Sequence, residues 1–175
     1  LAGDGIISGY PDGAFKSENK VTRNEIASMM VRLLKPEPVS KHDLQMSGEK
    51  FKDAGDIARW AQEAVAAALR EGLVSGYPQP DGTVSFAGER RVSRAELVAV
   101  LARVFEKQSG QVVPEALDFV DADKIPEWAG EVVGIAYTKG IADGYPDRTF
   151  RAENPVTRAE AASMIGRLAD LLDQK

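Results

Sequence analysis

The chain has 175 residues, of which 43% are hydrophobic and 28% are charged, proportions that are ordinary for a globular protein. Its formal net charge of −5 argues against nucleic-acid binding, because that function needs a dense basic surface to displace counterions from phosphates. No stretch approaches the roughly 20 apolar residues of a transmembrane helix, so we expect no membrane insertion, and no secretory signal sequence is recognisable.

Catalytic and metal-binding side chains are scarce. The sequence has no cysteine, which excludes disulfides, thiol nucleophiles and cysteine-rich metal sites. The single histidine, His42, cannot by itself form a histidine metal site or a catalytic triad. Acidic pairs at residues 53–56 and 121–123 lack the Asp-x-Asp-x-Asp-Gly order of a calcium loop. We therefore expect no catalytic residue, no bound metal and no cofactor.

One pattern occurs three times along the chain. A Gly-Tyr-Pro triplet places tyrosines at residues 10, 77 and 145, so the period is 67 and then 68 residues. A repeat of this length is a supersecondary unit that buries its apolar face against its neighbours. Any binding site that the unit carries is therefore copied with it.

The first repeat, residues 1–38, consists of the loop and one predicted helix, which begins after Thr22. The helix has apolar residues at helical spacing, namely Ile26, Met29, Met30, Leu33 and Leu34. The opening helix of the other repeats has no counterpart here, so we expect a neighbouring segment or a partner chain, as in a homo-oligomer, to cover that part of the core. A polar connector, residues 35–50, follows, and we expect His42 to be a solvated loop residue in it.

The second repeat, residues 51–106, contains the complete pattern. The apolar spacing that starts at Trp60 predicts a first helix over residues 57–70. Gly72 then stands where a helix end favours a residue with positive φ. The Gly-Tyr-Pro loop is longer here than in the other repeats, and a second helix is predicted to begin after Ser93.

The third repeat, residues 119–175, follows a connector at residues 106–118 and has the same order. A first helix is predicted near residues 126–138, ended by Gly140, and a second begins after Thr157. In every repeat a phenylalanine closes the loop, and we expect it to anchor the loop in the core. These residues are Phe15, Phe86 and Phe150.

Each second helix begins with a capping box. The hydroxyl of the first residue accepts a hydrogen bond from the amide three positions on, and the glutamate at that position reaches back to the N–H of the first residue. The boxes run from Thr22 to Glu25, from Ser93 to Glu96 and from Thr157 to Glu160. We expect these hydroxyl and glutamate side chains to stabilise the helix starts.

An arginine follows the cap residue in every box, at Arg23, Arg94 and Arg158. A cation at a helix N-terminus is unfavourable by roughly 0.3–1 kcal/mol, because the macrodipole is positive there. Free helix amides and a guanidinium together suit a carboxylate or phosphate ligand. The alternative is that each arginine pairs with an acidic residue of its own fold, such as Asp12 or Asp147. The sequence leaves both interpretations open.

Aromatic residues recur near these positions. Tyr10, Tyr77 and Tyr145 stand beside a turn proline, and Trp60 and Trp128 lie at the beginning of the first helices. Tyrosine and tryptophan offer flat amphipathic surfaces of the kind that stack on sugar rings. For the two tryptophans, burial in the core explains the pattern equally well.

The ordered motifs Phe-x-Asp…Trp-Ala, Gly-Tyr-Pro-Asp-Gly and Thr-Arg-Ala-Glu together resemble the surface-layer homology (SLH) motif. The resemblance covers nearly the whole chain, as two full copies and the latter part of a third. It implies an all-α fold, in which three helix-loop-helix repeats form one compact pseudo-threefold helical bundle.

The resemblance also implies a function. SLH motifs typically anchor exported proteins non-covalently to secondary cell wall polymers, which implies an extracellular location on the bacterial surface. The typical ligand is a pyruvylated glycan that contains N-acetylmannosamine (ManNAc), bound in grooves between motifs, and its carboxylate suits an arginine. The residues that we expect to bind it are Arg23, Arg94, Arg158, Gly9, Gly76, Gly144, Tyr10, Tyr77, Tyr145, Trp60 and Trp128.

The sequence departs from the family pattern in places. Asn24 replaces alanine in the first box, and Ser93 replaces threonine in the second. The second loop is lengthened over residues 77–82, and Arg148 replaces glycine in the third loop. We therefore do not expect equal affinity at the three sites.

A protein–protein module that assembles a cell-surface layer is the main alternative function. In that case the repeats mainly mediate self-association, through the part of the first repeat that lacks its opening helix. A wall hydrolase is a remote third hypothesis, since no acid/base pair stands out from the spacing.

Overall fold

The structure, a computed structural model, describes residues 6–7, 9 and 13–173. This part of the chain forms six α-helices and one two-stranded antiparallel sheet, so the expected helical class is confirmed. The elements are α1 (Arg23–Leu34), α2 (Lys41–Lys50), α3 (Gln62–Arg70), β1 (Tyr77–Pro78), β2 (Val84–Ser85), α4 (Arg94–Ser109), α5 (Gly130–Thr138) and α6 (Arg158–Asp173).

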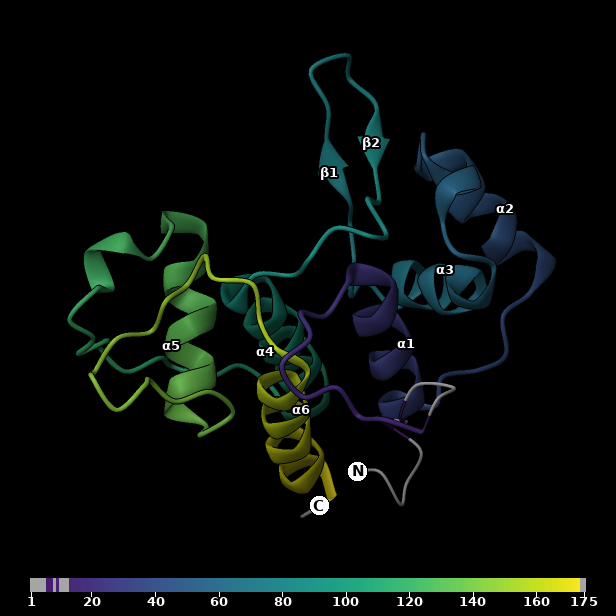
Figure 1. Cartoon of the computed structure of the whole chain (residues 1–175). Helices are drawn as coiled ribbons and strands as arrows, with labels where there is room; N and C mark the ends of the chain where they lie inside the picture. The colour runs from purple at the N-terminus through teal and green to yellow at the C-terminus, as the bar shows by residue number, and fades with distance from the viewer. Residues whose placement is uncertain (1–5, 8, 10–12, 174–175) are drawn as a thin grey trace. The chain divides into compact units, whose positions relative to one another are not determined.

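The internal contacts divide the chain into two compact units. Unit 1 consists of Leu1–Phe15 and Val21–Arg91, and unit 2 consists of Lys16–Lys20 and Val92–Lys175. In unit 1, α3 packs against both α1 and α2, and the β1–β2 hairpin projects from these helices as a narrow arm (Figure 1). In unit 2, α4 packs against both α5 and α6.

Each unit has a core in which an aromatic pair holds the loop. In unit 1 the rings of Phe51 and Phe86 lie 5.3 Å apart, and both side chains are buried. In unit 2 the rings of Phe119 and Phe150 are also 5.3 Å apart. Burial of one such ring stabilises a fold by about 1.5–3 kcal/mol, so each pair ties a loop firmly to the opening segment of its repeat. Apolar residues of α4, α5 and α6 complete the core of unit 2, including Leu97, Leu101, Ile135, Ile165 and Leu168.

The long helices begin where the sequence predicts. Thr22 and Ser93 form complete capping boxes with the glutamates three residues on. Thr157 does the same, since its N–H donates to Glu160 Oε2 over 2.8 Å and its Oγ1 accepts from the Glu160 amide over 3.2 Å. A cap of this kind stabilises a helix by about 1 kcal/mol.

The first helices end where expected but begin later. Residues 59–61 and 127–129 form single 3₁₀ turns, and the regular helices start only at Gln62 and Gly130. At the other end Gly72 and Gly140 have φ angles of 71° and 66°, as the helix-end prediction requires. The amide of the following residue bonds back to the helix in both cases, which completes the termination motif.

The connector at residues 35–50 is not a loop throughout, so that expectation is wrong. Residues Lys41–Lys50 form α2, which carries the exposed His42 and packs against α3. Ser40 and Asp43 make a capping box at its start, a signal that the sequence contains and that its weak apolar pattern obscures. Similarly, α4 continues to Ser109 and takes in the beginning of the second connector.

The lengthened second loop is a β-hairpin, which the sequence analysis did not predict. Tyr77 pairs with Ser85 across the two short strands, and the amide of Gln79 donates to the Thr83 carbonyl over 2.8 Å. Asp81 accepts bonds from the backbone and the hydroxyl of Thr83, which fixes the turn. The extra residues of this loop therefore form an ordered arm.

The burial of the loop phenylalanines and of the two tryptophans differs in part from what the sequence predicts. Phe86 and Phe150 are 0% exposed as expected, but Phe15 is 39% exposed. The expected anchoring of the first loop in the core by Phe15 is therefore wrong. The tryptophans are surface residues, because 61% of Trp60 and 57% of Trp128 are exposed, and burial in the core is excluded for them.

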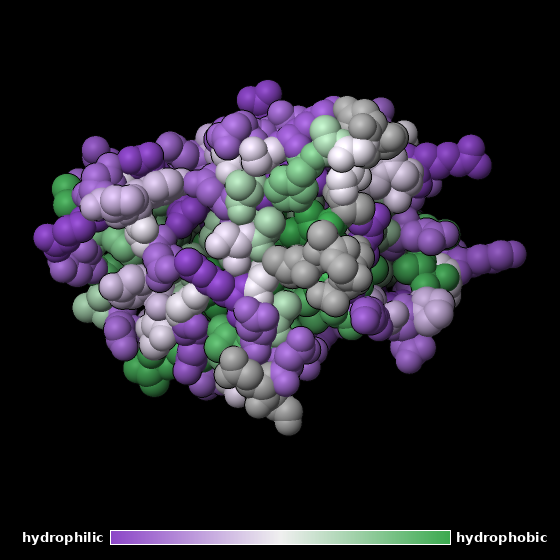
Figure 2. Space-filling model, turned by 60° about the horizontal axis from the view of Figure 1, so that its bottom comes forward, coloured by the Kyte–Doolittle hydropathy of each residue, from purple (hydrophilic) through white to green (hydrophobic). Residues whose placement is uncertain are grey.

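Hydrophilic residues form most of the face that Figure 2 shows, in keeping with the charged fraction of the sequence. No helix within the described residues combines the length and the apolarity that crossing a bilayer requires.

One departure from the family pattern is accommodated by a glycine. Asn24 is fully buried at the start of α1, and a Cβ atom added to Gly88 would lie 2.5 Å from its Oδ1. The Asn24 amide donates to the Gly88 carbonyl over 2.9 Å, and in unit 2 the same bond joins two alanines, Ala95 and Ala152. The equivalent bond at the third helix start joins Ala159 to Ser17. The asparagine is therefore paired with glycine, and the two alanines are paired with residues that have a Cβ atom, so the two positions are coupled.

We predict that Gly88→Ala lowers the free energy of unfolding by about 1–3 kcal/mol through overpacking. Adding Asn24→Ala recreates the pair found in unit 2 and is expected to recover most of that loss. Urea unfolding followed by circular dichroism measures both. Additive costs in the double variant would contradict the coupling.

Candidate functional site

The helix-start arginine of α1 lies against the loop of the second repeat. Arg23 donates from Nε to the Phe86 carbonyl over 2.7 Å and from Nη1 to the Tyr77 hydroxyl over 3.1 Å. Its guanidinium carbon is 4.4 Å from the centre of the Tyr77 ring and 4.8 Å from that of Phe86. Arg23 is half-buried.

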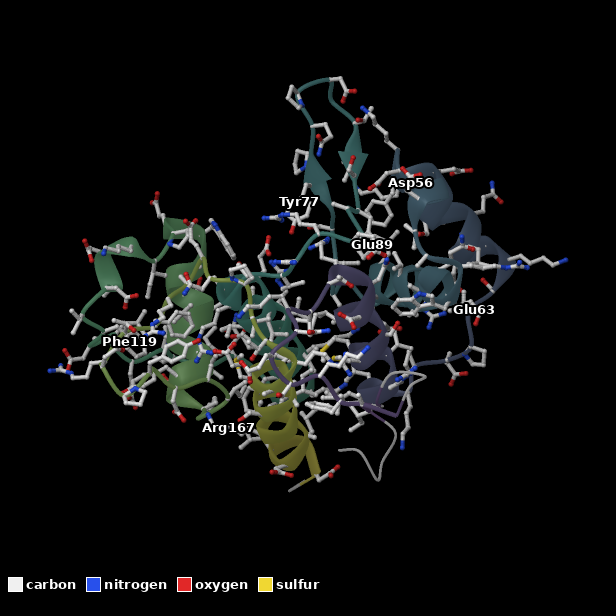
Figure 3. All side chains as sticks on the ribbon, viewed as in Figure 1. Asp56, Glu63, Tyr77, Glu89, Phe119 and Arg167 are labelled. Atoms are coloured by element: carbon white, nitrogen blue, oxygen red, sulfur yellow. The ribbon has the colours of Figure 1, made fainter. Side chains whose placement is uncertain are left out.

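A second cation contacts the same tyrosine. The guanidinium carbon of Arg90, an exposed residue, lies 4.3 Å from the Tyr77 ring centre. Figure 3 shows Tyr77 at the foot of the β1–β2 hairpin. Cation–π contacts of this kind are worth about 0.5–1 kcal/mol each at exposed positions. We call Arg23, Tyr77, Phe86 and Arg90 site 1.

Unit 2 contains a related cluster. The guanidinium carbon of Arg94 lies 4.8 Å from the ring centre of Tyr145 and 5.1 Å from that of Phe150. A second guanidinium, that of Arg151, lies 4.1 Å from the Tyr145 ring centre. We call Arg94, Tyr145, Phe150 and Arg151, with the adjoining Glu160, site 2.

Arg94 is buried and held by the protein. It is 7% exposed, its Nη2 donates to the Asp143 carbonyl over 2.5 Å, and its Nη1 lies 3.6 Å from Glu160 Oε1. The Tyr145 hydroxyl donates to the same carboxylate oxygen. The alternative of an internal ion pair is therefore realised for Arg94, with Glu160 as its partner.

These contacts change the acidity of both groups. Burial raises the pKa of Tyr145, and its hydrogen bond to Glu160 raises it further. Burial also opposes ionisation of Glu160, but the bonds from Tyr145 and Thr157 and the charge of Arg94 outweigh it and lower the pKa of that carboxyl. At neutral pH the pair is thus a neutral phenol bonded to a carboxylate.

Of the two acidic residues suggested as arginine partners, the structure describes one. Asp147 pairs with Arg151 over 2.6 Å, and its bonds from the Thr149 hydroxyl and Arg151 lower its pKa to about 2. Asp12 lies outside the described residues. Tyr10 lies outside them as well, so no third cluster is described around Arg158, which is 4% exposed.

The helix-start amides are not free. The amide of Arg23 donates to the Arg90 carbonyl over 3.1 Å, and the amide of Arg94 donates to the Asn154 carbonyl over 2.9 Å. The amide of Arg158 donates in the same way to Asn19 over 2.8 Å. The expectation that free amides would bind an anion at these helix starts is therefore wrong, and side chains are left as the groups that can bind.

The loop glycines have a structural reason. A Cβ atom at Gly76, whose φ is 80°, would lie 2.7 Å from the Phe51 ring, and one at Gly144 would lie 2.6 Å from the Phe119 ring. At Gly9 it would lie 3.3 Å from the Ala14 carbonyl oxygen. The glycines of the second and third repeats thus let the loop backbone approach the phenylalanine of the opening segment.

Two aspartates that the sequence analysis considered only as metal ligands support the sites. Asp53 accepts hydrogen bonds from the amides of Phe86 and Ala87, both over 2.7 Å. Asp121 accepts from the amides of Phe150 and Arg151 over 2.7 and 2.9 Å. Their identical places in the two Phe-x-Asp motifs were the signal available in the sequence. Within the described residues, no three His, Cys, Asp or Glu side chains are grouped to hold a metal ion.

Trp60 lies apart from site 1. Trp60 adjoins the C-terminal half of α1, beside Val31 and Arg32, rather than its N-terminal end. Trp128 belongs to the 3₁₀ turn that precedes α5. The structure therefore brings arginines and tyrosines together but leaves Trp60 outside site 1.

Comparison with known families identifies the repeats. The S-layer homology domain matches residues 1–27, 50–98 and 118–162, which together make up more than half of the chain. The chain belongs to the S-layer homology domain family. Each matched segment ends within the first turns of α1, α4 or α6, so each includes a capping box and its arginine.

Three relatives have names that refer to anchoring, to the cell surface or to an S-layer. The chain is 34% identical to a cellulosome-anchoring protein and 33% identical to cell surface glycoprotein 1, both of Acetivibrio thermocellus. It is 29% identical to S-layer protein EA1 of Bacillus anthracis. These matches cover 93%, 92% and 94% of the chain but only 35%, 7% and 18% of the relatives. The SLH chain thus spans about a third or less of their length.

We predict that Asp121→Asn lowers the free energy of unfolding by about 1–3 kcal/mol. The asparagine side chain has one uncharged acceptor oxygen, whereas the aspartate accepts the two backbone hydrogen bonds with two charged oxygens. Burial raises the pKa of Asp121, but the hydrogen bonds from the two amides lower it by more, so the pKa is below its usual value. Its contribution is therefore present above the unfolded-state pKa, near 3.8, and is lost as pH falls toward the folded-state value.

Urea unfolding of the parent and of Asp121→Asn between pH 3 and pH 7 checks this. The stability difference between the two is expected to be largest at neutral pH and to shrink below about pH 4. A difference that stays constant across this range would contradict the assigned role.

Proposed function

We propose that this SLH chain anchors the protein that carries it to the bacterial cell wall, outside the cell, by binding a secondary cell wall polymer. Its family supports this, as do the names of relatives that anchor cellulosomes or belong to S-layers. The ligand in this proposal is an acidic saccharide, and more specifically a pyruvylated glycan that contains ManNAc. The chain has no catalytic role in this proposal.

The observation that carries the proposal is the exposed guanidinium on the tyrosine of each described site. Arg90 and Arg151 reach solvent while they lie 4.3 and 4.1 Å from the ring centres of Tyr77 and Tyr145. A guanidinium held against a ring is pre-organised, so it loses less freedom when it binds a carboxylate. The partly exposed tyrosines add an amphipathic surface for the sugar.

The helix-start arginines have a different part in the two sites. Arg23 is half-buried and bonds to the Tyr77 hydroxyl, so its charge adds to that of Arg90 at the same ring. Arg94 is 7% exposed and bonded to the Asp143 carbonyl, so it contacts the Tyr145 ring from the protein interior. In this proposal the exposed arginines meet the ligand and the buried one positions the ring.

Two modest sites are sufficient for retention on a wall. Once one site has bound a polymer chain, binding at the second is effectively intramolecular and the overall avidity exceeds either affinity. The attraction between a guanidinium and a carboxylate at the surface is screened by salt, so binding should weaken as ionic strength rises.

We predict that the double variant Arg90→Ala, Arg151→Ala keeps its helix content and loses about two- to thirtyfold in affinity for purified cell wall, since each exposed guanidinium–carboxylate pair contributes about 0.2–1 kcal/mol. Co-sedimentation with wall preparations measures the affinity, and circular dichroism checks the fold. Unchanged co-sedimentation of the double variant would contradict the proposed site.

Arg103→Ala is the matched control, because Arg103 is an exposed arginine of α4 outside both sites. It is expected to bind wall as the parent does. Light scattering with and without wall glycan separates anchoring from the alternative of self-assembly, which predicts a growing mass without glycan.

A further inference from the structure

A cleft in unit 1, separate from site 1, has the chemistry of a second ligand site. Its volume is about 280 Å³, and it lies between the C-terminal half of α1, residues 36–39 and the beginning of α3. At the α-helical rise of about 1.5 Å per residue, Arg32 at the cleft lies about 13 Å along α1 from Arg23 of site 1. A ligand in the cleft therefore does not need site 1.

The cleft exists because α1 ends early. Lys35 takes a left-handed conformation with φ 46°, and the chain turns back through two prolines in residues 36–38. Arg70 of α3 fixes this segment by donating to the Glu37 carbonyl over 2.7 Å and to the Pro38 carbonyl over 3.3 Å. The corresponding helix of the next repeat, α4, runs on to Ser109 and does not make this turn.

An exposed indole and a serine with an unsatisfied hydroxyl belong to the lining of the cleft. Trp60 is 61% exposed beside the cleft, which is unusual because tryptophan side chains are on average largely buried. Ser28 is only 8% exposed, and its buried Oγ has no hydrogen-bond partner among the residues that the structure describes. Leaving a buried hydroxyl without a partner costs about 1–3 kcal/mol, so a partner from outside the chain would relieve it.

The charged residues that line the cleft differ from those of the two arginine–tyrosine sites. They are Arg32 on α1, Glu37 after it and Glu63 on α3, which Figure 3 labels, so the cleft has a small excess of negative charge that disfavours an acidic ligand. Val31 and Val39 add apolar wall. A volume at the small end of ligand pockets, roughly 300–1,000 Å³, suits one sugar ring. The combination favours a neutral ligand with a flat apolar face, several hydroxyls and one small apolar substituent.

We propose that the cleft lined by Ser28, Trp60 and Glu63 binds a neutral N-acetylhexosamine residue of a polysaccharide. The ring stacks on the Trp60 indole, and Ser28 Oγ completes its hydrogen bonding with a sugar hydroxyl or amide. The acetyl methyl group packs against the valines, and Arg32 and Glu63 bind the remaining hydroxyls. This site is independent of the acidic-glycan sites proposed above.

The test uses the fact that the chain has two tryptophans. Trp128→Phe leaves Trp60 as the only indole, and its fluorescence is titrated with N,N′-diacetylchitobiose and with cellobiose, which lacks the acetamido groups. A saturable change with diacetylchitobiose and a much weaker one with cellobiose is expected. No response of Trp60 overturns the proposal, and an equal response to cellobiose overturns the choice of N-acetylhexosamine.

Ser28→Ala in the same background separates binding from folding. Because the Oγ of Ser28 has no partner in the described part of the chain, stability in urea is expected to be unchanged or higher. Affinity for diacetylchitobiose is expected to fall about fivefold with the lost bond to the sugar. Undiminished affinity overturns the assigned role of Ser28.

A second variant distinguishes the two proposals. Arg90→Ala with Arg151→Ala, added to Trp128→Phe, is expected to keep the Trp60 response while wall binding weakens. If wall binding proves independent of those arginines but diacetylchitobiose still titrates Trp60, the acidic site fails and the cleft stands. The reverse result removes the cleft and leaves the acidic sites.

Discussion

The hydrogen bonds between helix-start amides and the loop of another repeat are the interaction on which this structure depends. The first amides of an α-helix have no partner within the helix and must find one elsewhere. Here the amides of Arg23, Arg94 and Arg158 donate to the carbonyls of Arg90, Asn154 and Asn19. In each case donor and acceptor belong to different repeats. A repeat therefore completes its helix start only with a second copy. At Arg23 and Arg94 the loop that supplies the carbonyl also places a tyrosine and a phenylalanine beside the arginine.

This bond also decides what kind of binding surface is available. Since these amides are used within the protein, the binding mode that we propose depends on guanidinium and phenol groups. The two described sites obtain their outer cation from different loop positions. In the second loop the residue after Phe86 is Ala87 and the cation comes from Arg90, while in the third loop the residue after Phe150 is Arg151 itself. Equivalent tyrosine rings in the two sites are thus contacted by arginines from different positions in the loop.

The supporting residues are shared between structure and function. Asp53 and Asp121 accept hydrogen bonds from the loop amides. Gly76 and Gly144 let the loop backbone approach the phenylalanine of the opening segment. These groups touch no ligand in the proposed mode, but they fix the backbone on which Tyr77 and Tyr145 are carried. The early end of α1 adds a feature of its own, because the folded-back segment at residues 36–39 forms a cleft beside Trp60.

Local patterns in the sequence determined the three repeats, the capping boxes and the glycine helix ends, because each depends on residues three to six positions apart. The family and the helical class followed from the same motifs. Tertiary structure alone decided that Arg94 is buried with Glu160, that Phe15 is exposed and that Trp60 lies on a cleft. The physical reason is that burial and pairing depend on which distant segment supplies the neighbour, and no spacing within one repeat contains that information.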